Sequence, residues 1–166
     1  MLNSFENPHE YESYKIEKRE LEYRVVNETG HQYVFLKTFG REYDERTESD
    51  EIVGRVSMGI DQQHAIGKIG FEFHRDRADN SKASVEIGPA GESILILERH
   101  RGKGLGRILA ETAINWAKEV AREKQIQILA FRILINEGNI AAQKIAESLG
   151  FKAKLRAEVV FYELEV

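Results

Sequence analysis

Residues 101–106 read Arg-Gly-Lys-Gly-Leu-Gly, and they separate an apolar stretch from a long amphipathic pattern. The apolar stretch, 94–97, is typical of a short buried strand. After the glycines, apolar residues recur at helical spacing from Leu105 to Val120, which predicts a helix of about five turns. Three glycines between a strand and a helix let the backbone turn tightly and approach a ligand closely.

Several shorter segments before this junction alternate between apolar and polar residues, as strands do. Because their connections are short, we expect antiparallel pairing among them. The polar segment 75–82 predicts a turn, and the segment 41–51 predicts an exposed loop. The expected strands are 52–60, 66–74, 83–88 and 93–98.

The first 50 residues allow two interpretations. Residues 6–26 fit a helix that starts at an Asn-Pro pair, whereas residues 21–39 fit a hairpin around a turn at 27–30. We expect at least one strand here, at 33–38.

Beyond the long helix, a strongly apolar segment at 126–134 predicts a buried strand. Residues 139–149 predict a second helix, with Gly150 suited to a left-handed cap. Residues 159–166 predict a final strand, in which Val159 and Phe161, with Leu164 a further candidate, are expected to face inward. Strands followed by helix, strand, helix and strand predict an α+β, or mixed α/β, fold around one sheet.

Composition excludes several classes of protein. The 166 residues suit a single domain, and the absence of cysteine excludes disulfides, thiolate zinc sites and a cysteine nucleophile. A net charge of -4 argues against nucleic-acid binding by bulk charge. The five histidines show no metal-ligand spacing, so no metal is expected. No segment is typical of a signal peptide or a membrane span, and we therefore expect a soluble, cytoplasmic protein.

The glycine junction also carries a cluster of basic residues, which the overall acidity conceals. Together with the free amides of a helix N-terminus, these cations suit a pyrophosphate group. The alternative is a glycine-bearing turn with solvated basic side chains. A dinucleotide fingerprint is excluded because Arg107 stands where its third glycine would be, and no P-loop pattern is present. The basic residues are Arg99, Arg101, Lys103 and Arg107.

The pattern Arg-x-x-Gly-x-Gly, at Arg101, Gly104 and Gly106, resembles the pyrophosphate loop of the GNAT superfamily of acyl-CoA-dependent N-acyltransferases. A second element is similar to a later helix of that family, in the same order along the chain. The resemblance covers about residues 66–166 and hardly extends into 1–65. The second element consists of Asn139, Ala142, Ile145 and Gly150-Phe151.

The resemblance implies one N-acetyltransferase domain over residues 1–166, with a mostly antiparallel sheet that is flanked by helices. This sheet would splay between the strands at 93–98 and 126–133 and admit the pantetheine arm of acetyl-CoA. Residues 66–166 would form the acetyl-CoA-binding core, and 1–65 the acceptor side. Lys144 fits a solvated helix position equally well. The residues expected to bind acetyl-CoA are Leu95, Ile96, Leu97, Arg101, Gly102, Lys103, Gly104, Leu105, Gly106, Arg107, Asn139 and Lys144.

The implied activity is transfer of an acetyl group from acetyl-CoA directly to a primary amine, because no cysteine is present to form an acyl-enzyme. The acceptor stays open among an amino sugar, a protein N-terminus or lysine, a polyamine and an aminoglycoside. The alternative is a non-catalytic acyl-CoA-binding or sensing module. Homodimers are common in the family, and no nucleic-acid or membrane partner is expected.

A general base is expected because an alkyl ammonium titrates near 10. Glu86 is the first candidate, since a carboxylate inside a short central strand suggests a cleft. Many family members carry a tyrosine as general acid at the position of Ala146, so a tyrosine acid is not expected here. The other candidate bases are Glu92, Glu72, His74 and His100.

Overall fold

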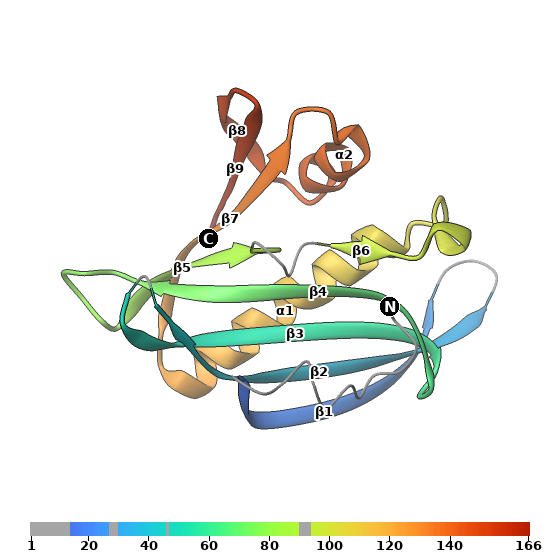
Figure 1. Cartoon of the computed structure of the whole chain (residues 1–166), viewed down its shortest axis with the longest axis horizontal. Coiled ribbons are helices and arrows are strands. Elements are labelled where there is room, and N and C mark those ends of the chain that lie inside the picture. The colour runs from blue at the N-terminus through green and yellow to red at the C-terminus, as the bar shows by residue number, and fades with distance from the viewer. Residues whose placement is uncertain (1–13, 27–29, 46, 90–93) are drawn as a thin grey trace.

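The computed structural model describes residues 14–26, 30–45, 47–89 and 94–166. Within these ranges the chain forms one nine-stranded sheet, with a long helix against one face (Figure 1). The elements are β1 (Tyr14–Val26), β2 (His31–Asp44), β3 (Ser49–Asp61), β4 (His64–Arg75), β5 (Lys82–Ile87), β6 (Leu95–Ile96), the 3-10 turn η2 (Glu98–His100), α1 (Leu105–Lys124), β7 (Gln127–Asn136), α2 (Ile140–Ser148), β8 (Lys152–Arg156) and β9 (Val159–Glu165).

The main path of the sheet runs β1-β2-β3-β4-β5-β7-β9-β8, and β6 pairs with β4 outside this path. The β5–β7 pair is parallel, because α1 carries the chain back across the sheet between β6 and β7. The four long strands β1–β4 are joined by hairpins and pair antiparallel. α1 lies against the face of this half, whereas α2 lies beside β7 at the other end of the molecule (Figure 1).

The core lies between α1 and the inward faces of the strands. Trp116 on α1 is buried beside Phe39 of β2, with 5.9 Å between the ring centroids, and its Nε1 donates a hydrogen bond to the carbonyl oxygen of Thr38 at 2.9 Å. Phe71 on β4 packs directly over Gly54 on β3. A Cβ on Gly54 would lie 2.0 Å from the Phe71 ring, so this position accepts no side chain without rearrangement.

β5 and β6 pair with two different parts of the same strand, β4. Phe71 pairs with Ile87 of β5, whereas Gly67, four residues earlier, pairs with Ile96 of β6, nine residues later. If β5 and β6 formed one continuous strand against β4, the partner residue would also shift by only four positions. The chain between β5 and β6 therefore contains five residues more than continuous pairing would use. β6 has no pairing with β7, and the sheet therefore splays at the predicted place, between the segments 93–98 and 126–133.

The mixed α/β fold with helices flanking one splayed sheet is confirmed, as are the turn at 75–82 and both helices. The left-handed cap is also confirmed, since Gly150 has a φ of 94°. The expected strand at 93–98 is ordered as β6 over only Leu95–Ile96, and residue 93 lies outside the described residues. No helix in the described ranges is long and apolar enough to cross a membrane.

The structure decides between the two interpretations of the first 50 residues, and two other expectations are wrong. The hairpin is confirmed in its paired strands, with the expected strand at 33–38 inside β2, whereas 14–26 form a strand and not a helix, because β1 pairs with β2 along its whole length. Most of 41–51 continues β2 and β3 and is not a loop. In β9 the inward residues are Val160 and Tyr162, both fully buried, instead of Val159 and Phe161. A shift of one residue reverses the two faces of a strand. β8 was not predicted, because its residues are mostly exposed and polar.

Candidate active site

The glycine loop between η2 and α1 has the backbone form of an anion site. Gly102 and Gly104 have φ angles of 78° and 75°, and a Cβ at either position would meet no atom within 4 Å. Gly104 is the N-cap of α1. In the described part of the chain no side chain caps this helix end, and no acidic residue lies in its first turn. The first amides of α1 are therefore available to a negatively charged group, beside the exposed Lys103 and Arg107.

Contacts with β6 hold this loop in place. The Nε of Arg101 donates to the carbonyl oxygen of Ile96 at 2.9 Å, which ties the loop back to the strand. The amide of Leu97 donates to the carbonyl oxygen of Ile66 on β4, at 2.9 Å. The Leu97 amide is thus used within the sheet, so a ligand between β6 and β7 would have to use other backbone groups. These two hydrogen bonds attach the start of the loop to the sheet.

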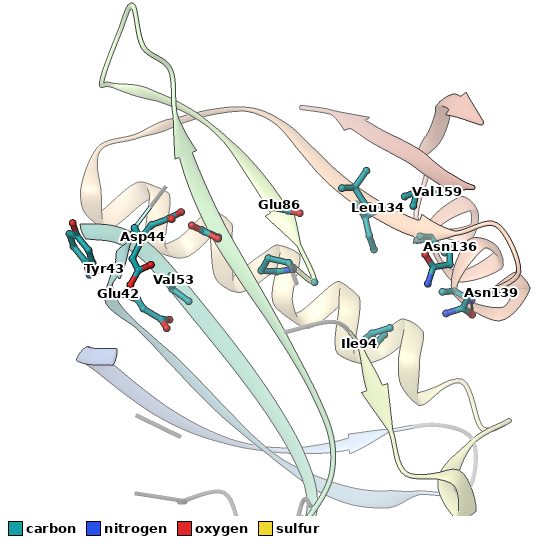
Figure 2. Close-up of a pocket in the computed structure, with 17 residues that line it drawn as sticks. Glu42, Tyr43, Asp44, Val53, Glu86, Ile94, Leu134, Asn136, Asn139 and Val159 are labelled. Carbon is teal, nitrogen blue, oxygen red and sulfur yellow. Dashed lines mark hydrogen bonds between the residues drawn. The ribbon is translucent and has the colours of Figure 1, made fainter. Parts of the chain in front are cut away.

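A cleft of about 750 Å³ opens where β5 and β7 stop pairing (Figure 2). It extends from the end of β2, past β5, to the N-terminus of α2. Ile94 connects it to the start of α1, since a Cβ on Gly106 would lie 3.6 Å from Ile94 Cδ1. The lining residues are Glu42, Tyr43, Asp44, Glu45, Val53, Glu72, Glu86, Gly88, Pro89, Ile94, Ile133, Leu134, Ile135, Asn136, Asn139, Ala142 and Val159.

Three titratable side chains meet on the cleft face of β4 and β5. Glu72 and Glu86 are directly opposite each other in the β4–β5 pair, and His74 lies two residues beyond Glu72 on the same face. His74 Nε2 is 3.0 Å from Glu86 Oε2. One nitrogen or oxygen from each of the three residues lies within 4.8 Å of the others. The group could hold a cation or pass a proton. It brings two residues of β4 together with Glu86 of β5, which is 12 or more positions further along the chain.

The surroundings of His74 favour its protonated form. The hydrogen bond with Glu86 has the largest effect and raises the pKa of His74 above 6.5, with further increases from the charges of Glu72, Glu86 and Glu51. Partial burial opposes this increase. In contrast, burial lowers the pKa of His100 below 6.5, with help from Lys103 and Arg99. His100 lies in η2 and is not among the described residues that line the cleft.

Under the cleft, between α1, α2 and the sheet, lies an apolar space. Ile94, Ile133 and Ala142 line both this space and the cleft. Ala146, at the position where a tyrosine acid was considered, is buried here with 2% of its surface exposed. Tyr162 does not substitute for it, because its hydroxyl donates to Glu147 on α2 at 3.1 Å and burial raises its pKa.

The sequence-predicted residues fall into two groups. The glycine loop places the candidates of 101–107 together at the N-terminus of α1, whereas Glu86 and Asn139 line the cleft. Asn139 caps α2, accepting a hydrogen bond from the amide of Ala142 at 3.2 Å. Lys144 is exposed on α2 and is not among the cleft-lining residues. Glu92 lies outside the described residues.

Sequence reasoning named Glu72, His74 and Glu86 separately but missed that they form one group. The signal that could have found it is the strand pairing. A turn at 75–82 sets β4 against β5 and so brings Glu72 opposite Glu86. The acidic end of β2, at Glu42 and Asp44, was missed because it was assigned to a loop.

Three solved structures with a similar fold are distant from this chain in sequence. Arabidopsis thaliana NAA60 in complex with a bisubstrate analogue has a TM-score of 0.56 and 10% identity, covering 68% of this chain and 75% of its own. The NatC complex bound to Gag peptide and CoA has a TM-score of 0.52 and 19% identity, covering 68% and 70%. The GNAT domain of S. lividans PAT has a TM-score of 0.50 and 18% identity, covering 69% of this chain and 61% of its own.

At these identities the likeness establishes the fold alone. The chain spans less than two thirds of the length of the S. lividans protein. No curated protein shows significant sequence similarity to it. The sequence model of the Acetyltransferase (GNAT) family, however, matches residues 3–151, which is most of the chain and includes much of the segment 1–65 that the motifs left unmatched. The chain therefore belongs to the acetyltransferase (GNAT) family.

Proposed function

We propose that this protein is an N-acetyltransferase that uses acetyl-CoA and a primary amine, with Glu86 as the general base. The observation that carries the proposal is the position of Glu86, in a cleft that opens where the pairing of β5 with β7 ends. The glycine loop starts from β6, which pairs with the same strand as β5. This reaction requires a loop that binds the phosphates of acetyl-CoA and, close to it, a carboxylate that acts as the general base.

The cosubstrate half of the site fits the pyrophosphate of acetyl-CoA. The open space above Gly102 and Gly104 leaves room for phosphate oxygens, and Lys103 and Arg107 supply positive charge. The splay between β6 and β7 gives the pantetheine arm a route from the loop to Glu86. Acetyl-CoA supplies the activated thioester, and the chain binds and orients it.

On the acceptor half, Glu86 removes the proton that the amine must lose. The amine lone pair attacks the thioester carbonyl carbon and the carbon–sulfur bond breaks. The nitrogen of the adduct then loses its second proton, which goes to the departing thiolate, so the products are an amide and free CoA thiol. His74 is the positioning residue, because its Nε2 contacts Glu86 at 3.0 Å and fixes that carboxylate in the cleft.

The thiolate leaves without a tyrosine acid in this proposal. A thiol titrates near 8.5, roughly 1.5 units below an alkyl ammonium, so the thiolate is a fair leaving group. Positioning of the two reactants in one cleft then accounts for much of the acceleration.

The test is release of free thiol from acetyl-CoA with a panel of primary amines. Wild-type protein is expected to release thiol only when a suitable amine is present. Glu86→Gln should lower kcat by about 100-fold or more, the usual contribution of a general base. The loss should shrink at high pH, where free amine is more abundant. Glu111→Gln, on the exposed face of α1, is the matched control and should behave as wild type.

Two results would contradict the proposal. If acetyl-CoA raises the melting temperature but no amine triggers thiol release, the chain is a binding module and not an enzyme. If Glu86→Gln retains the wild-type rate and pH profile, another group is the base.

A further inference from the structure

We infer that the donor site accepts propionyl-CoA at least as well as acetyl-CoA, with the third carbon of the acyl group in the apolar space between α1, α2 and the sheet. The inference rests on the proposed acyl-transfer function and concerns the donor side of the same site. It follows from the lining, the position and the volume of the apolar space.

The apolar space is lined by small side chains where the two helices meet. Every described residue that lines it is apolar. Ala110 on α1 and Ala142 and Ala146 on α2 are among them, and the two alanines of α2 are one helical turn apart. Because an alanine side chain ends at Cβ, these positions leave room between the helices. Any larger residue at Ala146, which is 2% exposed, would extend into the space.

The lining restricts what can enter the apolar space. An amine acceptor arrives as an ammonium ion, and its burial without a polar partner would be costly. The pantetheine arm carries amides, which also need hydrogen-bond partners. Small apolar cavities stay dry, so water does not compete for the space. Among the groups that the reaction brings together, the hydrocarbon end of the acyl group can enter without carrying a polar atom with it.

The apolar space begins where the acyl group must lie in the proposed reaction. Glu86 and Ile87 are consecutive on β5 and point to opposite faces of the sheet, so Glu86 lines the cleft and Ile87 lines the space. β5 ends at Ile87, and Ile94 and Ala142 line both the cleft and the space. Figure 2 shows Glu86 near the end of β5 and Ile94 beside α1. A thioester at Glu86 can therefore direct its acyl group around the strand end.

The volume of the apolar space selects a short acyl group. It is about 20 Å³. A group the size of a water molecule needs roughly 10–15 Å³, and a methyl group is somewhat larger. The space thus holds about one methyl group, which is the difference between acetyl and propionyl. A longer chain would have to separate the two helices from the sheet.

Transfer of a propionyl group uses the same bonds as transfer of an acetyl group. The ammonium proton of the acceptor goes to Glu86, one carbon–nitrogen bond forms, and the carbon–sulfur bond of propionyl-CoA breaks. The second proton of the nitrogen goes to the departing thiolate. The products are an N-propionyl amide and free CoA thiol, so no further reactant is needed.

The experiment compares acetyl-, propionyl- and hexanoyl-CoA as donors to one amine, the member of the panel that gives the fastest thiol release. For wild type we expect kcat/KM to be about fourfold higher with propionyl-CoA than with acetyl-CoA, the gain from burying one methylene group. Hexanoyl-CoA should be tenfold or more below propionyl-CoA. At equal concentrations, propionyl-CoA should also raise the melting temperature by more than acetyl-CoA does.

Two variants change the apolar space in opposite directions. Ala146→Val fills it, and should lower the propionyl-to-acetyl ratio of kcat/KM by about fourfold or more and remove the difference in melting temperature. Leu149→Ala enlarges it, and should raise the hexanoyl-to-acetyl ratio by about tenfold, which loss of folded protein alone cannot do. The matched control is Ala121→Val, a buried position of α1 that is not among the described lining residues, and it should keep the wild-type ratios.

The inference and the proposed function can fail separately. A wild-type propionyl-to-acetyl ratio below 1, or ratios that neither Ala146→Val nor Leu149→Ala changes, would overturn the inference and leave the acetyltransferase function standing. If no amine accepts an acyl group from any donor, the proposed function fails, and the melting temperatures decide the inference. In that case a larger shift with propionyl-CoA in wild type but not in Ala146→Val would support it, and any other pattern would overturn it.

Discussion

His74 Nε2 lies 3.0 Å from Glu86 Oε2, across the antiparallel pair of β4 and β5. Glu72 stands directly opposite Glu86 in the same pair, and two like charges in that position repel each other. The imidazolium of His74 offsets this repulsion. A protonated histidine is thus part of what holds two carboxylates together on one cleft face.

The pKa of His74 makes the stability of the protein depend on pH. The hydrogen bond with Glu86 raises this pKa above 6.5 in the folded state, so folding favours the protonated form. The stabilisation is complete below the unfolded pKa of about 6.5 and is lost as pH rises through the folded value. We expect wild type to exceed His74→Gln in stability by about 1 kcal/mol or less near pH 6, because the pair is partly exposed. The difference should shrink by about pH 8.5.

Urea unfolding, followed by the fluorescence of Trp116, the single tryptophan, measures this difference. Repeating the comparison in a Glu86→Gln background is the control, since the pH dependence should then weaken. A difference between wild type and His74→Gln that grows as pH rises would show that His74 folds in its neutral form.

A comparison of alanine substitutions at Gly104 and Gly30 separates the effect of backbone strain on stability from the effect on acetyl-CoA binding. Their φ angles are 75° and 71°, and a Cβ on either would meet no atom within 4 Å. Alanine at such an angle costs about 1–2 kcal/mol, so both Gly104→Ala and Gly30→Ala should lower the melting temperature by roughly 2–4 °C or more. Only Gly104→Ala should also remove most of the stabilisation by acetyl-CoA, because its methyl group would occupy the space for the phosphates.

A thermal melt with and without acetyl-CoA gives both quantities. Equal ligand-induced shifts in the two variants would argue that the glycine loop does not approach the pyrophosphate.

The contact between Gly54 and Phe71 limits the size of the side chain that β3 can accommodate at position 54. A methyl group on Gly54 would lie 2.0 Å from the Phe71 ring, in the core between the sheet and α1. Gly54→Ala should therefore destabilise the fold by about 1–3 kcal/mol, the usual cost of overpacking. Phe71→Leu removes the clashing ring atoms, so Gly54→Ala should cost less in the Phe71→Leu background than in wild type. Urea unfolding of the four proteins measures this coupling, and strictly additive effects would contradict it.

Sequence alone predicted the parts of this fold that local chemistry determines. The apolar spacing after Gly106 identified α1, and Gly150 identified the end of α2. Both signals lie within a few residues of the structure that they specify. The same is true of the glycine loop, whose basic residues and open backbone positions are neighbours in the chain.

The remaining features depend on pairing between distant segments. β1 carries charged residues at many positions and could be a helix by composition, and only its pairing with β2 makes it a strand. The inward face of β9 was wrong because Val159–Tyr162 is apolar on both faces, so alternation gave no unique choice. For the same reason the contact of His74 with Glu86 was not predicted, since it depends on the register that sets β4 against β5.

β4 determines the geometry of the whole site, because both halves are attached to it. Gly67 and Lys68 hold β6 and the glycine loop, and residues from Phe71 onward hold β5 and its carboxylate. The segment between β5 and β6 is therefore anchored at both ends to one continuous strand. A change in the length of this segment would leave the paired positions on β4 in place, because the entropy of closing a connection varies slowly with its length. The distance along β4 from Lys68 to Glu72, about 13 Å, would stay constant. The chain can thus vary its length beside Glu86 without moving the attachment points of β5 and β6 on β4 apart.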